Sequence, residues 1–171
     1  LDPVTGETLW VCRGINDGPD ENLDKLNWSL LGVISEARES IQIMTPYFLP
    51  ENPVIEALSV ASMKGIEVDI ILPETSNLPF VDWASRGLLE PLLEKEIRIW
   101  LHPPPFHHGK LMVVDNAWSL IGSSNWDPRS LRLNFEYNVE CYDSAFAEKL
   151  SRLMTSEINQ SERLTLQGYR D

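Results

Sequence analysis

The chain has 171 residues, which is enough for one domain with a substantial buried core. Its 14 basic against 26 acidic residues give a net charge of −12, and this balance argues against a broad groove for the nucleic-acid backbone, because such grooves are basic. With 43% hydrophobic and 23% charged residues, and no apolar run near the ~18 residues that cross a membrane, the composition indicates a soluble globular domain.

Strand and helix patterns alternate along the chain. Short runs of β-branched and aromatic residues predict strands, at 9–12, 41–44, 68–72, 97–101 and 135–142. Apolar residues at helical spacing predict helices, at 27–39, 53–65, 80–95 and 144–159. We expect Asn27 to cap the first helix, Gly65 to end the second, and residues 14–21 to form a polar loop. The alternation predicts one α/β domain over residues 1–171, a three-layer α/β/α sandwich around a mixed β-sheet.

The two cysteines, Cys12 and Cys141, both lie in strand-like stretches. No metal-ligand spacing accompanies them, and we interpret them as buried thiols rather than a disulfide. A reducing compartment is the corresponding expectation.

The stretch 108–125, which reads HGKLMVVDNAWSLIGSSN, places polar residues at fixed intervals around two short apolar runs. The runs are too brief for helices and Asn116 tolerates a positive φ, so we predict a hairpin with its turn at 116–117. In that register His108 faces Asn125 and Lys110 faces Ser123. After a shift of one residue in the turn, His108 faces Ser123 instead.

A cluster of His, Lys, Asn and Ser side chains with no carboxylate beside it forms a cationic hydrogen-bonding pocket. Such a pocket suits phosphate: Lys110 supplies positive charge, the amide and hydroxyl groups donate hydrogen bonds, and the imidazole of His108 can attack phosphorus or carry a proton. Strand alternation turns Asp115 away from this cluster, which predicts a supporting role for it.

The whole stretch matches H-x-K-x4-D-x6-G-S-x-N at every position, and it therefore resembles the phospholipase D superfamily. The flanking segments MTPYFLP, PPPFHHGKLMVVD and LIGSSNWDPRSLRLNFEYNVECYD narrow the resemblance to the C-terminal half of bacterial cardiolipin synthases. The similarity extends over roughly residues 8 to 165.

This resemblance implies a mechanism and a set of site residues. Two H-x-K motifs, one from each half, meet at a shared cleft, where one His forms a phosphohistidine and the other protonates the leaving alcohol. The phosphatidyl group passes from one phosphatidylglycerol to another, glycerol is released, and no metal or other cofactor is required. The catalytic residues implied here are His108, Lys110, Asp115, Asn125 and Glu136, with Glu136 orienting the imidazole.

Residues around the motif are candidates for substrate binding. Ser123 is expected to contact the phosphate, while Arg129 and Arg132 hold a second phosphate or headgroup, or else form salt bridges with acidic neighbours. Tyr47 and Phe48 line a lipid-side pocket or belong to the core, and the core interpretation is favoured.

The partners implied are a phosphatidylglycerol-like phospholipid and a second H-x-K half-domain, from the same full-length chain or from a homodimer mate, but no nucleic acid. Because the chain begins with Leu1 rather than Met, we expect it to be part of a longer protein. The resemblance implies that segments preceding Leu1 attach the full-length protein to the cytoplasmic face of the cell membrane. Two alternatives stay open: a homodimeric nuclease or phosphodiesterase of the same superfamily, and a non-catalytic half that binds phospholipid headgroups.

Overall fold

The computed structural model describes residues 10–18, 24–75, 79–105, 108–127 and 134–170, with side chains of the third helix only from Gly87 onward. The strands are β1 (Val11–Asp17), β2 (Ser40–Met44), β3 (Glu67–Pro73), β4 (Arg98–His102), β5 (Leu111–Val114), β6 (Trp118–Gly122), β7 (Glu136–Tyr142) and β8 (Glu162–Leu164). The helices are α1 (Lys25–Glu36), α2 (Asn52–Met63), α3 (Pro79–Glu94), α5 (Ser144–Ile158) and α6 (Leu166–Arg170).

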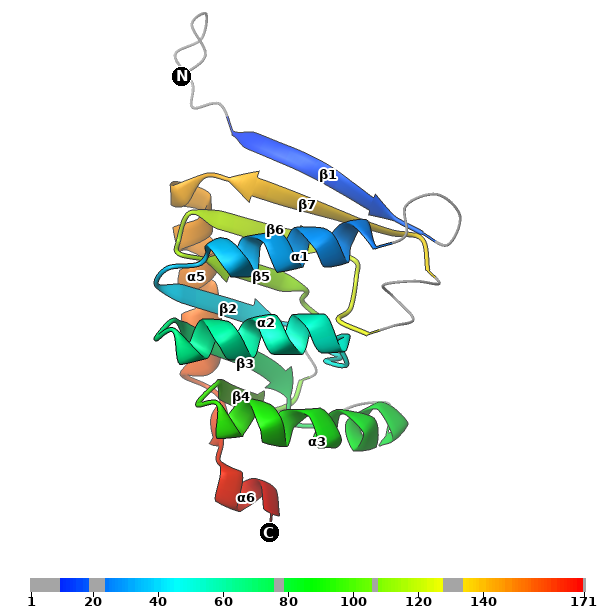
Figure 1. The fold of residues 1–171 in the computed structure, drawn as a ribbon, viewed down its shortest axis with the longest axis vertical. Helices are drawn as coiled ribbons and strands as arrows, with labels where there is room; N and C mark the ends of the chain where they lie inside the picture. The colour runs from blue at the N-terminus through cyan, green and yellow to red at the C-terminus, as the bar shows by residue number, and fades with distance from the viewer. Residues whose placement is uncertain (1–9, 19–23, 76–78, 106–107, 128–133, 171) are drawn as a thin grey trace, which may run out of the picture.

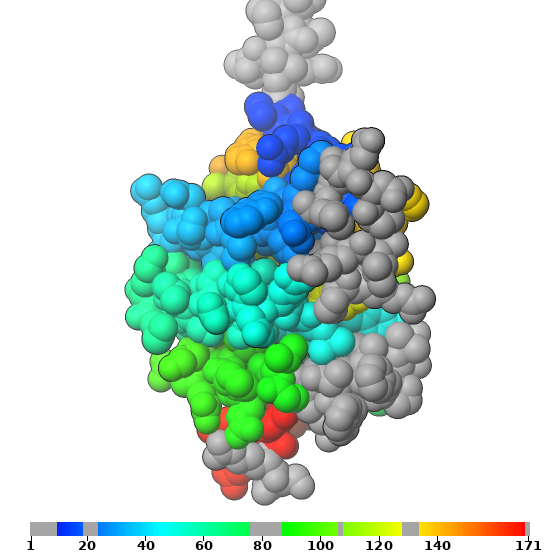
Figure 2. Space-filling view, turned by 45° about the vertical axis from the view of Figure 1, so that its right-hand side comes forward, coloured from blue at the N-terminus to red at the C-terminus, as the bar shows by residue number. Residues whose placement is uncertain are grey.

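One eight-stranded sheet runs through the molecule in the order β1-β7-β6-β5-β2-β3-β4-β8. The pairs β2–β3 and β3–β4 are parallel, as expected for strands joined by crossover helices, and the remaining pairs are antiparallel. Helices α1, α2 and α3 lie side by side on one face (Figures 1 and 2), and α5 crosses the other face (Figure 1). The predicted three-layer sandwich with a mixed sheet is confirmed.

Two apolar cores separate these layers. The larger one joins α1, α2 and α3 to the sheet through fully buried side chains such as Leu30, Leu58 and Leu92. The smaller one packs α5 on the opposite face, with Ala147 and Met154 against residues of β2, β3 and β5. Burial of both faces explains why β3 and β5 contain several apolar residues in a row.

The ends of α1 and α2 show where local sequence rules hold and where they do not. Gly65 has a φ of 89°, and its N–H donates to Ser62 while that of Ile66 donates to Ala61, so the predicted glycine end of α2 is confirmed. By contrast, α1 begins at Lys25 with Asp24 in the capping position. The prediction that Asn27 caps α1 is wrong, because Asn27 lies inside the helix and is buried.

Strand β1 is longer than the sequence pattern indicates. Residues 14–17, predicted to be loop, continue the strand because every residue of β1 from Val11 to Asp17 has a partner in β7. Cys12 faces Cys141 in this ladder, and the two form a disulfide with a Cα–Cα distance of 4.2 Å. The prediction of two free thiols is therefore wrong; it failed because the long-range pairing of β1 with β7 has no local sequence signal.

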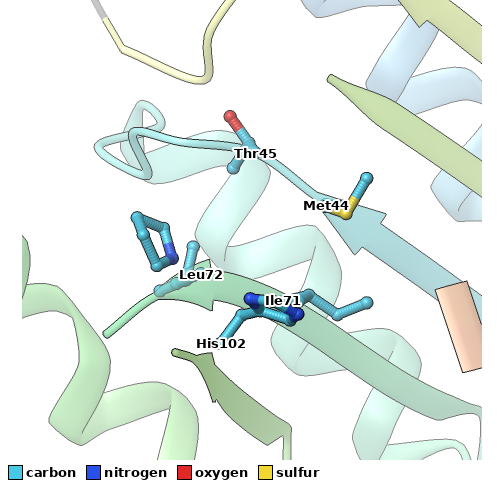
Figure 3. A pocket seen from close by; sticks show the side chains of 6 residues that line it. Met44, Thr45, Ile71, Leu72 and His102 are labelled. Carbon is cyan, nitrogen blue, oxygen red and sulfur yellow. The ribbon is translucent and has the colours of Figure 1, made fainter. Parts of the chain in front are cut away.

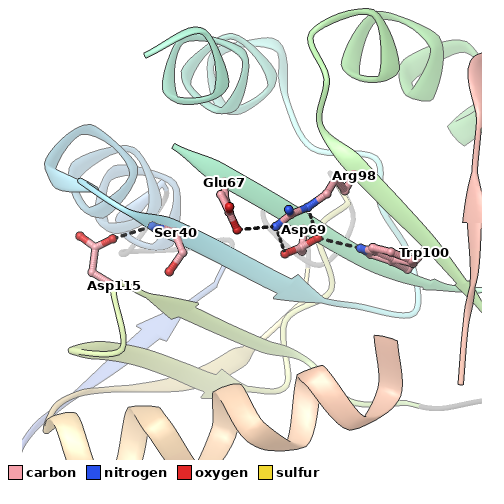
Figure 4. Close-up of polar contacts among 6 residues, drawn as sticks. All are labelled: Ser40, Glu67, Asp69, Arg98, Trp100 and Asp115. Atoms are coloured by element: carbon pink, nitrogen blue, oxygen red, sulfur yellow. Dashed lines mark hydrogen bonds and ion pairs between the residues drawn. The ribbon is translucent and has the colours of Figure 1, made fainter. Parts of the chain in front are cut away.

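A buried carboxylate in β3 shows how the fold provides hydrogen-bond partners for a charge inside the protein. Asp69 accepts hydrogen bonds from the guanidinium of Arg98, at 2.7 Å, and from the indole N–H of Trp100, at 2.7 Å (Figure 4). Arg98 also bonds Glu67 at the exposed edge of the cluster.

In the described part of the chain, no helix is both long and apolar enough to span a membrane.

Candidate active site

The motif residues lie on and around the β5–β6 hairpin. In its ladder Leu111 faces Ile121 and Val114 faces Trp118, and the carbonyl of Lys110 accepts from the N–H of Gly122. Lys110 is thus opposite Gly122, and neither predicted register is correct.

The turn accounts for this difference. Asp115 and Asn116 both have positive φ, at 52° and 50°, and the N–H of Ala117 donates to Val114. Three residues, 115–117, connect the strands where the sequence pattern suggested two. Each side chain of β6 is therefore displaced by one position relative to β5.

His108 and Lys110 form a direct pair just before β5. Lys110 Nζ lies 2.7 Å from His108 Nδ1 and donates to the backbone carbonyl of His108 at 3.0 Å. Tyr47, which follows β2, meets the imidazole edge-on with ring centroids 6.3 Å apart. His108 is exposed and Lys110 is half-buried, so the pair borders an open surface.

Glu136 brings a carboxylate into this cluster. The hairpin residues alone supply none, whereas the family resemblance implied Glu136 at this place. The Ser123 hydroxyl donates to Glu136 Oε2, and the Asn134 side-chain amide donates to Oε1 at 3.2 Å. The negative charge of Glu136 also acts on Lys110. The structure therefore collects His108, Lys110, Ser123 and Glu136 in one place.

The ionisation of the pair follows from burial and from neighbouring charge. Although His108 is exposed, its partial loss of contact with water lowers its pKa below 6.5, and the positive charge of Lys110 lowers the pKa further. Burial also lowers the pKa of Lys110, while Glu136 acts in the opposite direction. At neutral pH the imidazole of His108 is accordingly uncharged, the form that has a lone pair for nucleophilic attack or for accepting a proton.

Asn125 is held between two fixed points. Before it, the ladder of β6 ends at Gly122; after it, Trp126 is buried and stacks on Phe48 with ring centroids 5.9 Å apart. The N–H of Leu49 donates to the Trp126 carbonyl at 2.6 Å. Phe48 belongs to the core, whereas Tyr47 lies beside His108.

Asp115 lies at the other end of β5 from Lys110. Its carboxylate accepts three backbone N–H groups, from Arg38 at 2.9 Å, Glu39 at 2.8 Å and Ser40 at 2.9 Å. Figure 4 shows its bond to Ser40 at the start of β2. These bonds connect the hairpin turn to the segment between α1 and β2, away from the imidazole.

Asp17 is a second carboxyl group at the site, and no local sequence pattern indicates it. It ends β1 directly opposite Glu136, is buried, and accepts the N–H of Gly18 through Oδ1 at 3.1 Å. Burial raises its pKa above 3.8, and the hydrogen bond from the Gly18 N–H opposes part of this increase. The negative charges of Asp24 and Glu136 raise the pKa further, and the positive charge of Lys25 has the smallest, opposite effect. Its position could have been found only from the pairing of β1 with β7.

Arg129 and Arg132, the predicted headgroup ligands, lie outside the described residues.

A pocket at the ends of β2, β3 and β4, lined by Met44, Ile71 and His102 among others, has a cavity volume of about 10 Å³ (Figure 3). This volume is about that of one water molecule and is too small for a phospholipid headgroup. Within the described residues, no group of three or more His, Cys, Asp or Glu side chains is placed to hold a metal ion.

Comparison with known families identifies the chain. A family model described as cardiolipin synthase, phospholipase D-like domain, matches residues 30–158. The chain belongs to this family. The sequence-based resemblance to phospholipase D-type cardiolipin synthases is thereby confirmed.

Curated members of the family are similar over nearly the whole chain. Cardiolipin synthase 2 of Staphylococcus epidermidis is 34% identical over 168 residues, which are 98% of this chain and 34% of that protein. A cardiolipin synthase of Clostridium perfringens is 30% identical over 155 residues, 91% of this chain and 33% of that protein. The chain thus spans about a third of the length of these curated relatives.

Solved structures share the fold of this phospholipase D-like domain. Nuc, a phospholipase D family member from Salmonella typhimurium, superposes with a TM-score of 0.77 at 21% identity, over 92% of this chain and 99% of that one. A phosphatidylserine synthase of Haemophilus influenzae gives a TM-score of 0.71 at 19% identity, over 92% of this chain and 41% of that one.

Proposed function

We propose that this chain is one half of the active site of a phosphatidyltransferase, which makes cardiolipin from two phosphatidylglycerol molecules and releases glycerol. The observation that carries this proposal is the pairing of His108 with Lys110 beside Glu136 and Ser123, in a chain of the cardiolipin synthase family. The likeness to curated cardiolipin synthases supports the choice of substrate.

The reaction has two displacements at phosphorus. An imidazole nitrogen forms a bond to phosphorus while the bond to the glycerol oxygen breaks, and a second imidazole gives that oxygen its proton. The hydroxyl of a second phosphatidylglycerol then attacks phosphorus, the bond to nitrogen breaks, and the second imidazole takes the hydroxyl proton.

The neighbouring groups act through charge and hydrogen bonds. Lys110 stabilises the negative charge on the phosphoryl oxygens, and the amide of Asn125 donates to them. Glu136 balances Lys110 and accepts the Ser123 hydroxyl, which orders that side of the site. Arg129 and Arg132 are proposed to hold the headgroup or a second phosphate.

A single imidazole bonded to phosphorus cannot also protonate the leaving oxygen, so the site needs a second half. We propose that this half is another H-x-K domain of the same full-length protein, or a second copy of this chain in a two-fold dimer. The apolar side chains next to Ser123 and Glu136 support this arrangement, since Ile121, Phe135 and Tyr137 are 36%, 79% and 60% exposed. We further propose that segments outside residues 1–171 hold the full-length protein at the cytoplasmic face of the membrane.

The test is phosphatidyl transfer by the full-length protein carrying this chain, assayed with phosphatidylglycerol and with release of glycerol measured. His108→Ala should abolish transfer, and Lys110→Ala should reduce it by about 10²–10³-fold, the usual effect of losing one such electrostatic donor. Lys149→Ala, which removes an exposed lysine of α5, is the matched control and should leave transfer unchanged.

Two outcomes would reject the proposal. Transfer by His108→Ala within tenfold of wild type would remove His108 from the chemistry. Cleavage of plasmid DNA by the wild-type protein, without any transfer from phosphatidylglycerol, would indicate the nuclease alternative instead.

A further inference from the structure

The turn that carries Ser123 and Asn125 is held in place by hydrogen bonds to an asparagine of β7. Asn138 is 2% exposed and lies directly opposite Gly122 in the β6–β7 ladder. It is two residues beyond Glu136, so both side chains project from the same face of β7. Lys110 also lies opposite Gly122, so its side chain projects from this same face of the sheet.

Asn138 clamps Ser124 from both sides. Its Nδ2 donates to Ser124 Oγ at 2.8 Å, and its Oδ1 accepts the N–H of Ser124 at 3.4 Å. Ser124 is 3% exposed, so both bonds are shielded from water and have no ready substitute. A carboxamide offers a donor and an acceptor together, so this one side chain can make both bonds.

Gly122 is shaped to receive this side chain. A Cβ at residue 122 would overlap Asn138 Oδ1 and would lie 2.5 Å from Asn138 Cγ and 2.8 Å from its Cα. The glycine of the motif therefore leaves the space that Asn138 occupies. Gly122 and Ser124 both depend on one side chain that is outside the motif.

The two serines of the motif consequently face different partners on β7. Ser124 is turned inward to Asn138, while the hydroxyl of Ser123 reaches Glu136. The N–H of Ser123 donates to the carbonyl of Tyr137, between those two partners. Asn125 follows immediately, before Trp126 enters the core beside Phe48.

We infer that Asn138 is a positioning residue for catalysis, because its clamp on Ser124 sets the places of Ser123 and Asn125 relative to His108 and Lys110. This inference rests on the proposed function and names a residue outside the H-x-K and Gly-Ser-x-Asn signatures. Asn138 touches no substrate. It acts through the backbone of the turn.

The first experiment compares kinetics of the full-length protein carrying Asn138→Ala, Ser124→Ala or both. Asn138→Ala should lower kcat by about 10- to 100-fold with KM nearly unchanged, because displacement of catalytic groups by about 1 Å has effects of this size. Ser124→Ala should act in the same direction. The double variant should be no slower than Asn138→Ala alone, since both single changes remove the same hydrogen bond.

Asp69→Asn is the matched control for stability. Asp69 is also a buried polar residue with two partners, but it lies at the start of β3, in the cluster with Arg98 and Trp100 (Figure 4). It should lower the melting temperature without lowering kcat. A kcat within twofold of wild type in folded Asn138→Ala overturns the inference, as does an equal loss of kcat in Asp69→Asn.

A second readout separates this inference from the proposed function. Hydrogen exchange at the amides of residues 123–125, followed in peptides of the full-length protein, should accelerate at least about tenfold in Asn138→Ala and stay unchanged in Asp69→Asn. Unchanged exchange in Asn138→Ala overturns the inference whatever the enzyme does. Accelerated exchange in a protein whose wild type transfers no phosphatidyl group instead rejects the proposed function.

Discussion

Replacing Asp115 by Ala tests whether the aspartate of the motif serves the fold rather than the chemistry. The change removes the acceptor of three backbone hydrogen bonds, those from Arg38, Glu39 and Ser40. It also places Ala at a φ of 52°, in the left-handed region. The backbone bond from Asp115 N–H to the Ser40 carbonyl is retained.

Comparison with a variant of the neighbouring residue separates the loss of stability into backbone strain and lost hydrogen bonds. Asn116 has a φ of 50° and is exposed, so Asn116→Ala carries the conformational strain of about 1–2 kcal/mol and no loss of the carboxylate. The three bonds of Asp115 are partly exposed, and we assign them about 1 kcal/mol each, below the usual value for a charged acceptor. Asp115→Ala should thus be less stable than Asn116→Ala by about 3 kcal/mol.

For a chain of this length, that difference corresponds to about 6–12 °C in melting temperature. Thermal unfolding of both variants at pH 7, by circular dichroism and calorimetry, measures it directly. Melting temperatures within 2 °C of each other would refute the assignment of these bonds. So would a collapse of phosphatidyl transfer in an Asp115→Ala protein as stable as Asn116→Ala, because that result would place the carboxylate in the chemistry.

Three further predictions concern charge and completeness. Glu136→Gln should lower turnover and move the alkaline limb of the pH–rate profile to lower pH, since the charge of Glu136 raises the pKa of Lys110; an unmoved limb would contradict this. The pKa of Asp17 is raised from 3.8, so its ionisation costs stability as the pH rises from 3.8 through the folded value. Asp17→Asn should therefore raise the melting temperature at pH 7 and flatten its dependence on pH; a decrease at pH 7 would show that the ionised group stabilises the fold. The chain alone should transfer little as a monomer, and any activity should rise with concentration as a dimer forms; full turnover in a monomer shown by sedimentation would disprove the half-site.

The parts of the fold that depend on local patterns could be predicted from the sequence. The apolar runs of β2, β3 and β5, the glycine that ends α2 and the spacing of His108 and Lys110 are all signals within a few residues of chain. The sequence predicts a turn at 116–117, one residue shorter than the turn at 115–117, because a stretch with Asp115 and Asn116 accommodates positive φ at either position or both.

The partners of the motif could not be predicted by the same means. Asn138 and Asp17 reach the site through the β6–β7 and β1–β7 ladders, which join segments far apart in the sequence. Glu136 reaches it in the same way, and only the family resemblance indicated it. The disulfide of Cys12 and Cys141 has the same origin. Periodicity predicts that a strand exists but does not determine which strand lies beside it in the sheet.

Strand β1 lies outside residues 30–158, the part of the chain that the family model matches. A chain shortened to that range would lose β1, interrupt α1 and uncover the backbone groups of β7 from Glu136 to Tyr142. A bare edge of this kind offers a template to strands of other molecules, and Cys141 would be left as a free thiol on it. Expression of residues 30–158 alone is thus expected to give aggregates. Fragments for study should therefore begin before Val11.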